Sequence, residues 1–179
     1  MKGLVIYKGR YGATKQYAVW IGTELGIPVA SSNRFPKDEL NKYDYFIIGS
    51  SVYIGKLEIK RWLKANLNVL INKKVFFFQV AALPVTEKEK RKTYNINGIP
   101  LPVLDKAKFF FFPGRMIMRN LSWLDRFLLK MGARVTKDPA ERTRMLTDFN
   151  EVNKEYTLPL INAVKAFSKT HEPEKELVS

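Results

Sequence analysis

Short apolar runs alternate along this chain with segments in which apolar residues recur at helical spacing. The apolar runs predict strands over residues 3–7, 27–30, 45–49, 74–81 and 109–112. The helical spacing predicts helices over residues 14–26, 57–71 and 143–168, the last with a kink at Pro159. The charged stretch 87–92 is expected to be helical or exposed, with irregular chain after it. Because strands separated by helices are typical of an α/β fold, we expect a three-layer sandwich with a five-stranded parallel sheet in the order 2-1-3-4-5.

Length and hydropathy favour one domain. The 179 residues, 46% of them hydrophobic, supply enough apolar material for a single core. We expect this domain to span residues 1–170, with an insertion after the fifth strand at about 115–142 and a polar tail at 171–179. Lys8 and Arg10 end the first apolar run too early for a secretory signal, and no run reaches the roughly 18 apolar residues of a membrane span. These features favour the cytoplasm.

The chain has no cysteine and a single histidine, and it is strongly basic. The absence of cysteine excludes disulfides, thiol catalysis and thiolate metal sites, so redox chemistry would need a bound organic cofactor and no metal is expected. A net charge of +14 attracts nucleic acid, anionic lipid or acidic small molecules. No nucleic-acid module is recognisable, so no nucleic acid is expected. DNA binding by charge alone stays an alternative, which steeply salt-dependent binding without flavin uptake would reveal.

A loop with two glycines follows the first predicted strand and leads directly into a helix. Gly9 and Gly12 allow backbone N–H groups to turn towards an anion, and the helix N-terminus adds partial positive charge. Thr14 offers a hydroxyl and Arg10 a formal charge. The loop lacks the Gly-Lys-Ser/Thr of a Walker A loop, so a single phosphate is its expected ligand. The alternative is an ordinary strand-to-helix turn with Thr14 as the N-cap.

The next two strand ends carry residues suited to a planar ring. Small polar residues and Tyr53, which can cover a ring face, occupy the loop 50–55 after the third strand. Small residues at 80–83, after the fourth strand, let a flat heterocycle approach the backbone. Each segment can also be an ordinary surface loop or a close-packed strand end. Because the ends of neighbouring parallel strands meet at the topological switch point, the three loops together predict an FMN site.

These loops resemble the FMN-binding loops of the flavodoxin family. The matching segments are Gly9–Thr14 and Ile47–Lys56. A Trp-x-Asp-Arg-Phe segment, Trp123–Phe127, is similar to one in the branch that contains menaquinone-dependent protoporphyrinogen IX dehydrogenase, the oxygen-independent protoporphyrinogen oxidase; electron-carrier flavodoxins lack it. A similar Thr-Asp-Phe, at residues 147–149, precedes the last helix. The resemblance covers almost the whole chain and implies a flavodoxin-like fold with FMN as cofactor.

The resemblance also implies the residues that contact FMN. They are Gly9, Arg10, Tyr11, Gly12, Ala13 and Thr14 around the phosphate, and Ser50, Ser51, Val52, Tyr53, Ile54, Gly55, Val80, Ala81, Ala82 and Leu83 around the ring. Gly9 and Tyr11 stand where flavodoxins usually carry hydroxyl residues, so side-chain contacts to the phosphate are reduced and lower FMN affinity is expected. No histidine or paired carboxylate stands out near the site, so no catalytic residue is assigned and the chemistry is expected on FMN.

The implied activity is an FMN-dependent oxidoreductase. It would take electrons from a reduced substrate, an anionic porphyrinogen, and pass them to a quinone. The alternative is a flavodoxin-like electron-transfer protein that shuttles electrons to a protein partner. Electron-carrier flavodoxins are generally acidic, whereas this basic chain suits the propionates of a porphyrinogen or an anionic membrane that holds quinone. The sequence does not predict an oligomeric state.

Apolar and basic residues interleave between residues 115 and 131. This pattern is typical of an interfacial helix at the inner face of a membrane, and equally of an amphipathic helix packed on its own domain. The residues expected to contact substrate or membrane are Arg115, Arg119, Trp123 and Arg126. The basic residues that follow, including Arg142 and Arg144, are expected to form a solvated face.

Overall fold

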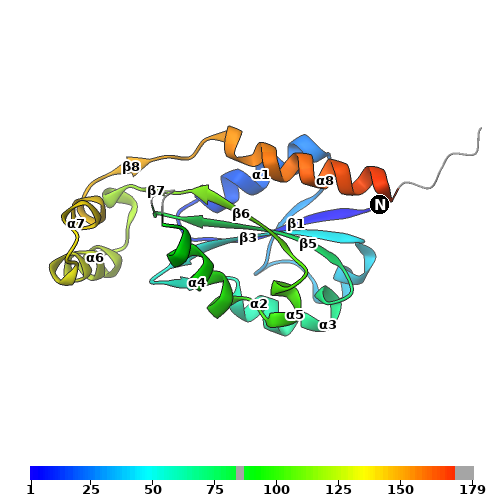
Figure 1. Cartoon of the computed structure of the whole chain (residues 1–179), viewed down its shortest axis with the longest axis horizontal. Helices are drawn as coiled ribbons and strands as arrows, with labels where there is room; N and C mark the ends of the chain where they lie inside the picture. The colour runs from blue at the N-terminus through cyan, green and yellow to red at the C-terminus, as the bar shows by residue number, and fades with distance from the viewer. Residues whose placement is uncertain (84–86, 172–179) are drawn as a thin grey trace, which may run out of the picture.

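A parallel sheet forms the centre of the fold (Figure 1). The computed structural model describes residues 1–83 and 87–171. The strands of the sheet are β1 (Gly3–Lys8), β2 (Val29–Ser31), β3 (Tyr45–Tyr53), β4 (Lys56–Leu57), β5 (Lys74–Ala81) and β6 (Lys108–Pro113). Five of them run parallel in the order β2-β1-β3-β5-β6, which confirms the expected fold class and strand order. The two-residue strand β4 was not expected, and it pairs antiparallel with the end of β3.

Helices cover both faces of the sheet (Figure 1). One face carries α1 (Ala13–Leu25) and α8 (Leu158–Thr170). The other face carries α2 (Lys60–Ala65), α3 (Leu67–Leu70), α4 (Lys88–Gly98) and α5 (Leu101–Leu104). Two 3₁₀ turns, η1 (Lys37–Lys42) and η3 (Lys154–Thr157), precede β3 and α8. The result is the three-layer sandwich that the alternating pattern predicts.

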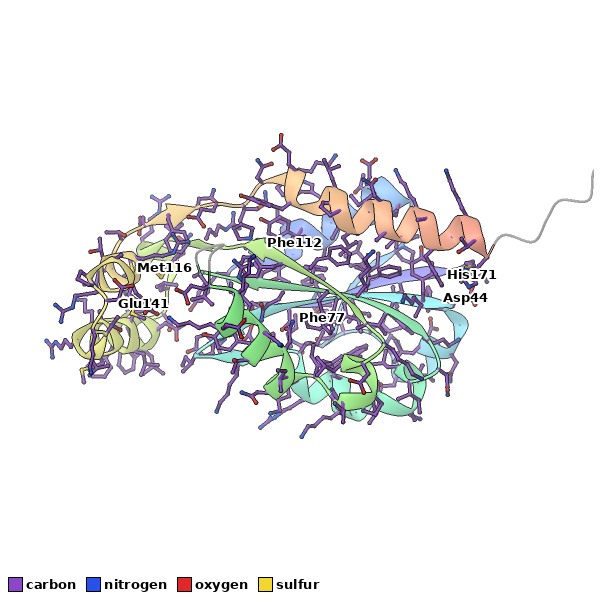
Figure 2. All side chains as sticks on the ribbon, in the orientation of Figure 1. Asp44, Phe77, Phe112, Met116, Glu141 and His171 are labelled. Atoms are coloured by element: carbon purple, nitrogen blue, oxygen red, sulfur yellow. The ribbon has the colours of Figure 1, made fainter. Side chains whose placement is uncertain are left out.

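Alternate residues of each strand supply two separate cores. In β5, Phe76 and Phe78 pack towards α1 and α8, whereas Phe77 packs towards α2 and α5. The ring of Phe78 stacks on that of Phe112 from β6, with the ring centroids 5.1 Å apart. Phe77 and Phe112 are labelled in Figure 2 and belong to opposite cores. Because both faces are covered, the central strands are continuous apolar runs, which made them recognisable in the sequence.

The helix expected over residues 57–71 is wrong in its boundaries. Its first residue belongs to β4, and Asn66 separates α2 from α3. The buried amide of Asn66 donates a hydrogen bond to the carbonyl oxygen of Trp62 at 2.7 Å, and such side-chain bonds to the backbone interrupt a regular helix. The irregular chain expected after residue 92 is also wrong, since α4 continues to Gly98 and α5 follows Pro100.

The single closing helix expected over residues 143–168 is wrong as well. That stretch contains the end of α7 (Pro139–Leu146), then β8 (Phe149–Asn150), η3 and most of α8. Strand β8 pairs antiparallel with β7 (Arg115–Met116), a contact that local periodicity cannot show. Pro159 lies in the first turn of α8, where its missing N–H has no helical partner to lose, so the expected kink has no cause. Most of the expected polar tail lies outside the described residues.

The chain between β6 and η3 forms an insertion beyond the carboxyl ends of the central strands (Figure 1). We define the insertion as residues 115–150; it contains β7, η2 (Met118–Asn120), α6 (Trp123–Val135), α7 and β8. The expected range of about 115–142 ends within α7, and the chain returns to pair with β7 only at β8. Ser122 caps α6 by accepting from Asp125 N, and Asp138 caps α7 by accepting from Ala140 N.

Tyr17 of α1 ties the first helix to the chain on both sides of the insertion. Its buried hydroxyl donates to the carbonyl oxygen of Pro113 at 2.8 Å and accepts from Asn153 N at 3.3 Å. Burial raises the pKa of Tyr17 to about 12, so the hydroxyl stays protonated. We expect Tyr17→Phe to lower the free energy of unfolding by about 1–2 kcal/mol in urea denaturation. Tyr156→Phe, at a tyrosine that is 40% exposed, should change it by less than about 0.5 kcal/mol; equal losses in the two variants would contradict this role.

Candidate functional site

A cavity of about 430 Å³ lies where the ends of the central strands meet the insertion. The sheet order reverses direction between β1 and β3, and the carboxyl ends of these strands face the cavity. Its walls are residues 10, 11, 13 and 14 after β1, 51–55 at the end of β3, 80–83 at the end of β5, Tyr94 of α4, and both apolar and charged residues of the insertion. Met116 and Glu141, both labelled in Figure 2, belong to the insertion side of this lining. The volume lies within the range of small-molecule sites.

The turn between β1 and α1 leaves helix amides free to bind a ligand. Gly12 is the N-cap of α1 with φ +84°, a left-handed conformation that favours glycine. No side chain of the described residues caps this helix, and its first helical bond runs from Gln16 N to Gly12 O at 2.9 Å. The N–H groups of residues 13–15 precede that bond and have no helical acceptor. Thr14 lies inside the helix, so the expectation that it is the N-cap is wrong.

Gly9 allows the Thr14 side chain to lie close to the backbone of the same turn. A Cβ atom at Gly9 would lie 2.6 Å from Thr14 Oγ1, which is too close for a side chain. Thr14 itself is buried and lines the cavity, whereas Gly9 is exposed and does not line it. Gly9 therefore acts on the position of Thr14, and the Thr14 side chain faces the site.

Arg115 of β7 brings a positive charge to this turn. Its Nη1 donates to Gln16 Oε1 at 3.1 Å, and its Nε and Nη2 lie 3.4 Å from the carbonyl oxygen of Tyr11. A Cβ atom at Gly12 would lie 2.8 Å from Arg115 Nη2. The structure thus places Arg115, which the sequence associated with substrate or membrane, beside the free amides of α1.

Arg10 is occupied by other partners. Its Nε bonds to Glu58 Oε1 at 2.8 Å, and its guanidinium lies 3.8 Å from the centre of the Tyr53 ring. The hydrogen bond with Glu58 raises the pKa of Arg10. Glu58 therefore offsets charge of Arg10, which still lines the cavity, and the predicted contact of Arg10 with the phosphate stays a prediction.

Asp125 connects the insertion to two of the loops that surround the cavity. This residue of α6 is 5% exposed and accepts hydrogen bonds from the hydroxyls of Tyr11 and Tyr53. Its backbone N–H donates to Ser122 Oγ at 3.1 Å, and Arg10 Nη1 lies 3.8 Å from its Oδ2. The loops after β1 and at the end of β3 are therefore held to α6 through one carboxylate.

Asp125 is held in its charged carboxylate form at neutral pH. Burial raises the pKa of Asp125, but the hydrogen bonds from Tyr11 and Tyr53 outweigh it and hold the pKa below its usual value. Burial and the bond to Asp125 raise the pKa of Tyr11, and the bond to Asp125 raises the pKa of Tyr53. The two phenols thus remain donors at neutral pH. A carboxylate stabilised in this way is a poor proton acceptor, so Asp125 suits positioning better than general base catalysis.

The turn after β3 brings small and apolar groups to the cavity. Ile54 and Gly55 adopt φ +46° and +67°, which reverses the chain into β4. Ser50, in contrast, is fully buried, and its hydroxyl donates to Ser51 O at 2.9 Å and accepts from Ile59 N at 3.3 Å. Ser50 does not line the cavity, because the alternation of β3 turns its side chain towards α2. The Ser50 side chain therefore lies away from the cavity, and the predicted contact of Ser50 with FMN stays a prediction.

Comparison with known proteins assigns the family. Residues 4–143 match the family model described as a flavodoxin domain. The chain belongs to the flavodoxin domain family. It is 23% identical over 166 residues to protoporphyrinogen IX dehydrogenase [quinone] of Escherichia coli K12. This match covers 85% of the chain and 91% of the Escherichia coli protein. It is 28% identical over 108 residues to an uncharacterized protein of Methanocaldococcus jannaschii, and this match covers 55% of the chain and 72% of that protein.

Solved structures with a similar fold include flavodoxins and a flavoprotein. Oxidised flavodoxin 2 from Bacillus cereus has a TM-score of 0.46 and 17% identity, with 92% of this chain and 99% of that chain covered. A flavoprotein of Lactobacillus acidophilus in complex with FMN has a TM-score of 0.44 and 20% identity, with 63% and 91% covered. The predicted resemblance to the flavodoxin family, with the dehydrogenase among its relatives, is confirmed. FMN is the cofactor of this flavodoxin chain.

The residues at the β1–α1 turn fit the phosphate of FMN. Left-handed Gly12 exposes the first amides of α1, and the charge of Arg115 lies beside them. Helix N-termini with free amides bind phosphate groups in this way. Among the described residues no group of three or more His, Cys, Asp or Glu side chains could hold a metal ion.

The residue pattern did not predict several residues that line the cavity. They are Tyr94, Gly114, Met116, Leu121, Asp125, Leu128, Leu129, Gly132, Glu141, Arg144, Met145 and Phe149. Arg144 was expected on a solvated face, but its Nε donates to Ala82 O at 2.9 Å and its Nη2 pairs with Glu151 at 2.7 Å. Arg119, Trp123 and Arg126 do not line the cavity. For Asp125 a signal existed, because it is the one acidic residue of α6.

Proposed function

We propose that this flavodoxin is an FMN-dependent oxidoreductase that takes electrons from an anionic porphyrinogen and passes them to a quinone. The observation that carries the proposal is the insertion, which Asp125 joins to the loops after β1 and β3. Asp125 belongs to the Trp-x-Asp-Arg-Phe segment that resembles the dehydrogenase branch, and the Escherichia coli relative bears that activity in its name. The net charge of +14 suits a substrate with carboxylate groups.

In this proposal the phosphate of FMN is held by the amides at the start of α1, by the hydroxyl of Thr14 and by Arg115. The ring is held between residues 51–55 and residues 80–83, which line the cavity. When bound, FMN supplies the redox chemistry by accepting and releasing electrons. Leu128 and Leu129 of α6 contribute an apolar wall that limits the access of water.

The protein's own contribution would be position and polarity. Asp125 fixes the hydroxyls of Tyr11 and Tyr53, so both loops take one defined arrangement relative to α6. We propose no proton acceptor among these groups, because the pKa of Asp125 is lowered. The proposed location is the cytoplasm, and the proposed partners are a quinone or a redox protein.

The substrate assignment can be tested with the purified protein. Added FMN should lose fluorescence on binding, and anaerobic incubation with protoporphyrinogen IX and menaquinone should produce fluorescent porphyrin. Protein without FMN and FMN without protein serve as controls, since both should give the slow background rate. If FMN binds but porphyrin does not accumulate above this background, the substrate assignment is wrong while the cofactor stands.

The alternative proposal is an electron-transfer protein that serves a protein partner. It is supported by the family match, which describes a flavodoxin domain without specifying a reaction. Potentiometric titration distinguishes the two. A wide separation of the two one-electron potentials, with a very low second potential, would indicate a carrier, whereas closely spaced potentials would favour the enzyme.

A further inference from the structure

The residues of α6 fall into three rows of different chemistry. Each row has a spacing of four residues, so its members lie on one side of the helix. One row, Asp125, Leu129 and Ala133, turns inward: Asp125 and Ala133 are buried, and Leu129 lines the cavity. The other two rows are apolar Trp123, Phe127 and Met131, and basic Arg126, Lys130 and Arg134.

The apolar row lies in solvent. Trp123 is 74% exposed, Phe127 is 53% exposed and Met131 is 42% exposed. Leu124, on the same side, is 46% exposed. An amphipathic helix that packed this row on its own domain would bury these side chains. The expectation that the segment packs on its own core thus holds for the inward row alone, and exposed apolar clusters of this kind mark interaction sites.

The basic row makes the outer surface of α6 cationic. Arg126, Lys130 and Arg134 are exposed beside the apolar row. The one acidic residue of α6, Asp125, is turned inward to Tyr11 and Tyr53. Arg119 is exposed on the preceding turn η2 and adds to the same charge. The outer face of α6 therefore places an apolar row beside a basic row.

We propose that the outer face of α6 docks on the surface of an anionic lipid bilayer, with the helix axis parallel to the membrane plane. An apolar row would enter the boundary of the acyl chains while the adjacent basic row meets the headgroups, and tryptophan favours this depth. The 13-residue helix is suited to lying on a bilayer, and no helix in the described ranges is long and apolar enough to cross one. The net charge of +14 complements anionic headgroups.

Docking would also bring the cavity to the lipid. Leu128 and Leu129 of α6 line the cavity, so the helix that meets the bilayer is also a wall of the site. A quinone dissolved in the bilayer would then lie close to FMN. This consequence rests on the proposed function, whereas the docking itself does not.

Vesicle cosedimentation of the full chain with added FMN tests the docking. The protein should bind vesicles of phosphatidylglycerol and phosphatidylcholine at least about tenfold more tightly than vesicles of phosphatidylcholine alone, and salt should weaken the binding. Trp123→Ser/Phe127→Ser should reduce binding by about tenfold or more. Ile96→Ser/Leu101→Ser, which changes two residues exposed by 52% and 66% on α4 and α5, should change it by less than about twofold.

Two matched charge variants distinguish an effect of the charges on α6 from an effect of the net charge of the protein. Arg126→Gln/Lys130→Gln and Arg61→Gln/Lys64→Gln each remove two exposed positive charges, the first pair from α6 and the second from α2. The α6 pair should weaken binding to anionic vesicles several-fold more than the α2 pair. Equal effects of the two charge variants, or equal effects of the two apolar variants, would overturn the proposal.

The oligomeric state gives a further test. If the wild type is a dimer in sedimentation analysis and Trp123→Ser makes it a monomer, the proposal is overturned, because the face is then an interface between copies. No substrate is used, so the outcome is independent of the porphyrinogen assay.

Discussion

Gly12→Ala should weaken FMN binding by about 1.5–3 kcal/mol, or roughly 10- to 150-fold in Kd. Gly12 has φ +84°, and a Cβ atom there would lie 2.8 Å from Arg115 Nη2. The methyl group would therefore push the guanidinium away and strain the turn that presents the amides of α1. Quenching of FMN fluorescence measures the loss of affinity, and urea denaturation measures the loss of stability.

Gly26→Ala is the matched control for this variant. Gly26 caps the other end of α1 with φ +64°, and nothing lies within 4 Å of a Cβ atom placed there. It carries a similar backbone strain at the opposite end of the helix from the cavity. We expect both variants to lose about 1 kcal/mol of stability, while Gly26→Ala keeps wild-type FMN affinity. A parallel loss of affinity in the two variants would show that general strain, and not the turn, governs binding.

Asp125→Ala should release the insertion from the loops of the cavity. The substitution removes the acceptor of the Tyr11 and Tyr53 hydroxyls, and hydrogen bonds to a charged acceptor contribute about 1.5–3 kcal/mol each. Tyr11 and Tyr53 are only half-buried, so their hydroxyls can bond to water in the variant, which offsets part of this loss. We expect the free energy of unfolding in urea to fall by about 2–3 kcal/mol, and tryptic cleavage at Arg126 and Lys130 to become faster. Asp105→Ala, at an exposed aspartate on α5's C-terminal side, should leave both unchanged. Unaltered cleavage of Asp125→Ala would contradict the connecting role.

The pH dependence of Asp125→Asn follows from the lowered pKa of Asp125. A carboxylate whose pKa is lower in the folded than in the unfolded chain stabilises the fold above its unfolded pKa of about 3.9. That contribution is lost as the pH falls through the folded pKa. The wild type should therefore be more stable than Asp125→Asn at pH 7, and the difference should shrink as the pH falls below about 4. A constant difference across this range would be evidence against a charged carboxylate in the cluster.

Strands and glycine turns were predictable because their signals are local. Residues 74–81 are buried on both faces of the sheet, so their apolar run is continuous in the sequence. Gly12 is followed at once by the helix whose amides it exposes. In contrast, the boundaries between residues 143 and 158 depend on the pairing of Arg115 with Asn150, which no local pattern encodes.

The apolar runs were sufficient to predict the parallel sheet and its strand order, and the loop motifs were sufficient to predict the flavodoxin family. The charges that face the cavity, in contrast, depend on contacts between residues far apart in the chain. Asp125 lies 114 residues from Tyr11 and 72 from Tyr53, and Arg115 lies 104 residues from Tyr11. Charged side chains on helices and loops are usually solvated, so a local pattern carries no sign of partners this distant. The packing of the insertion on the strand ends buries Asp125 and leaves Trp123 exposed, and this orientation gives α6 an inner face at the cavity and an outer face in solvent.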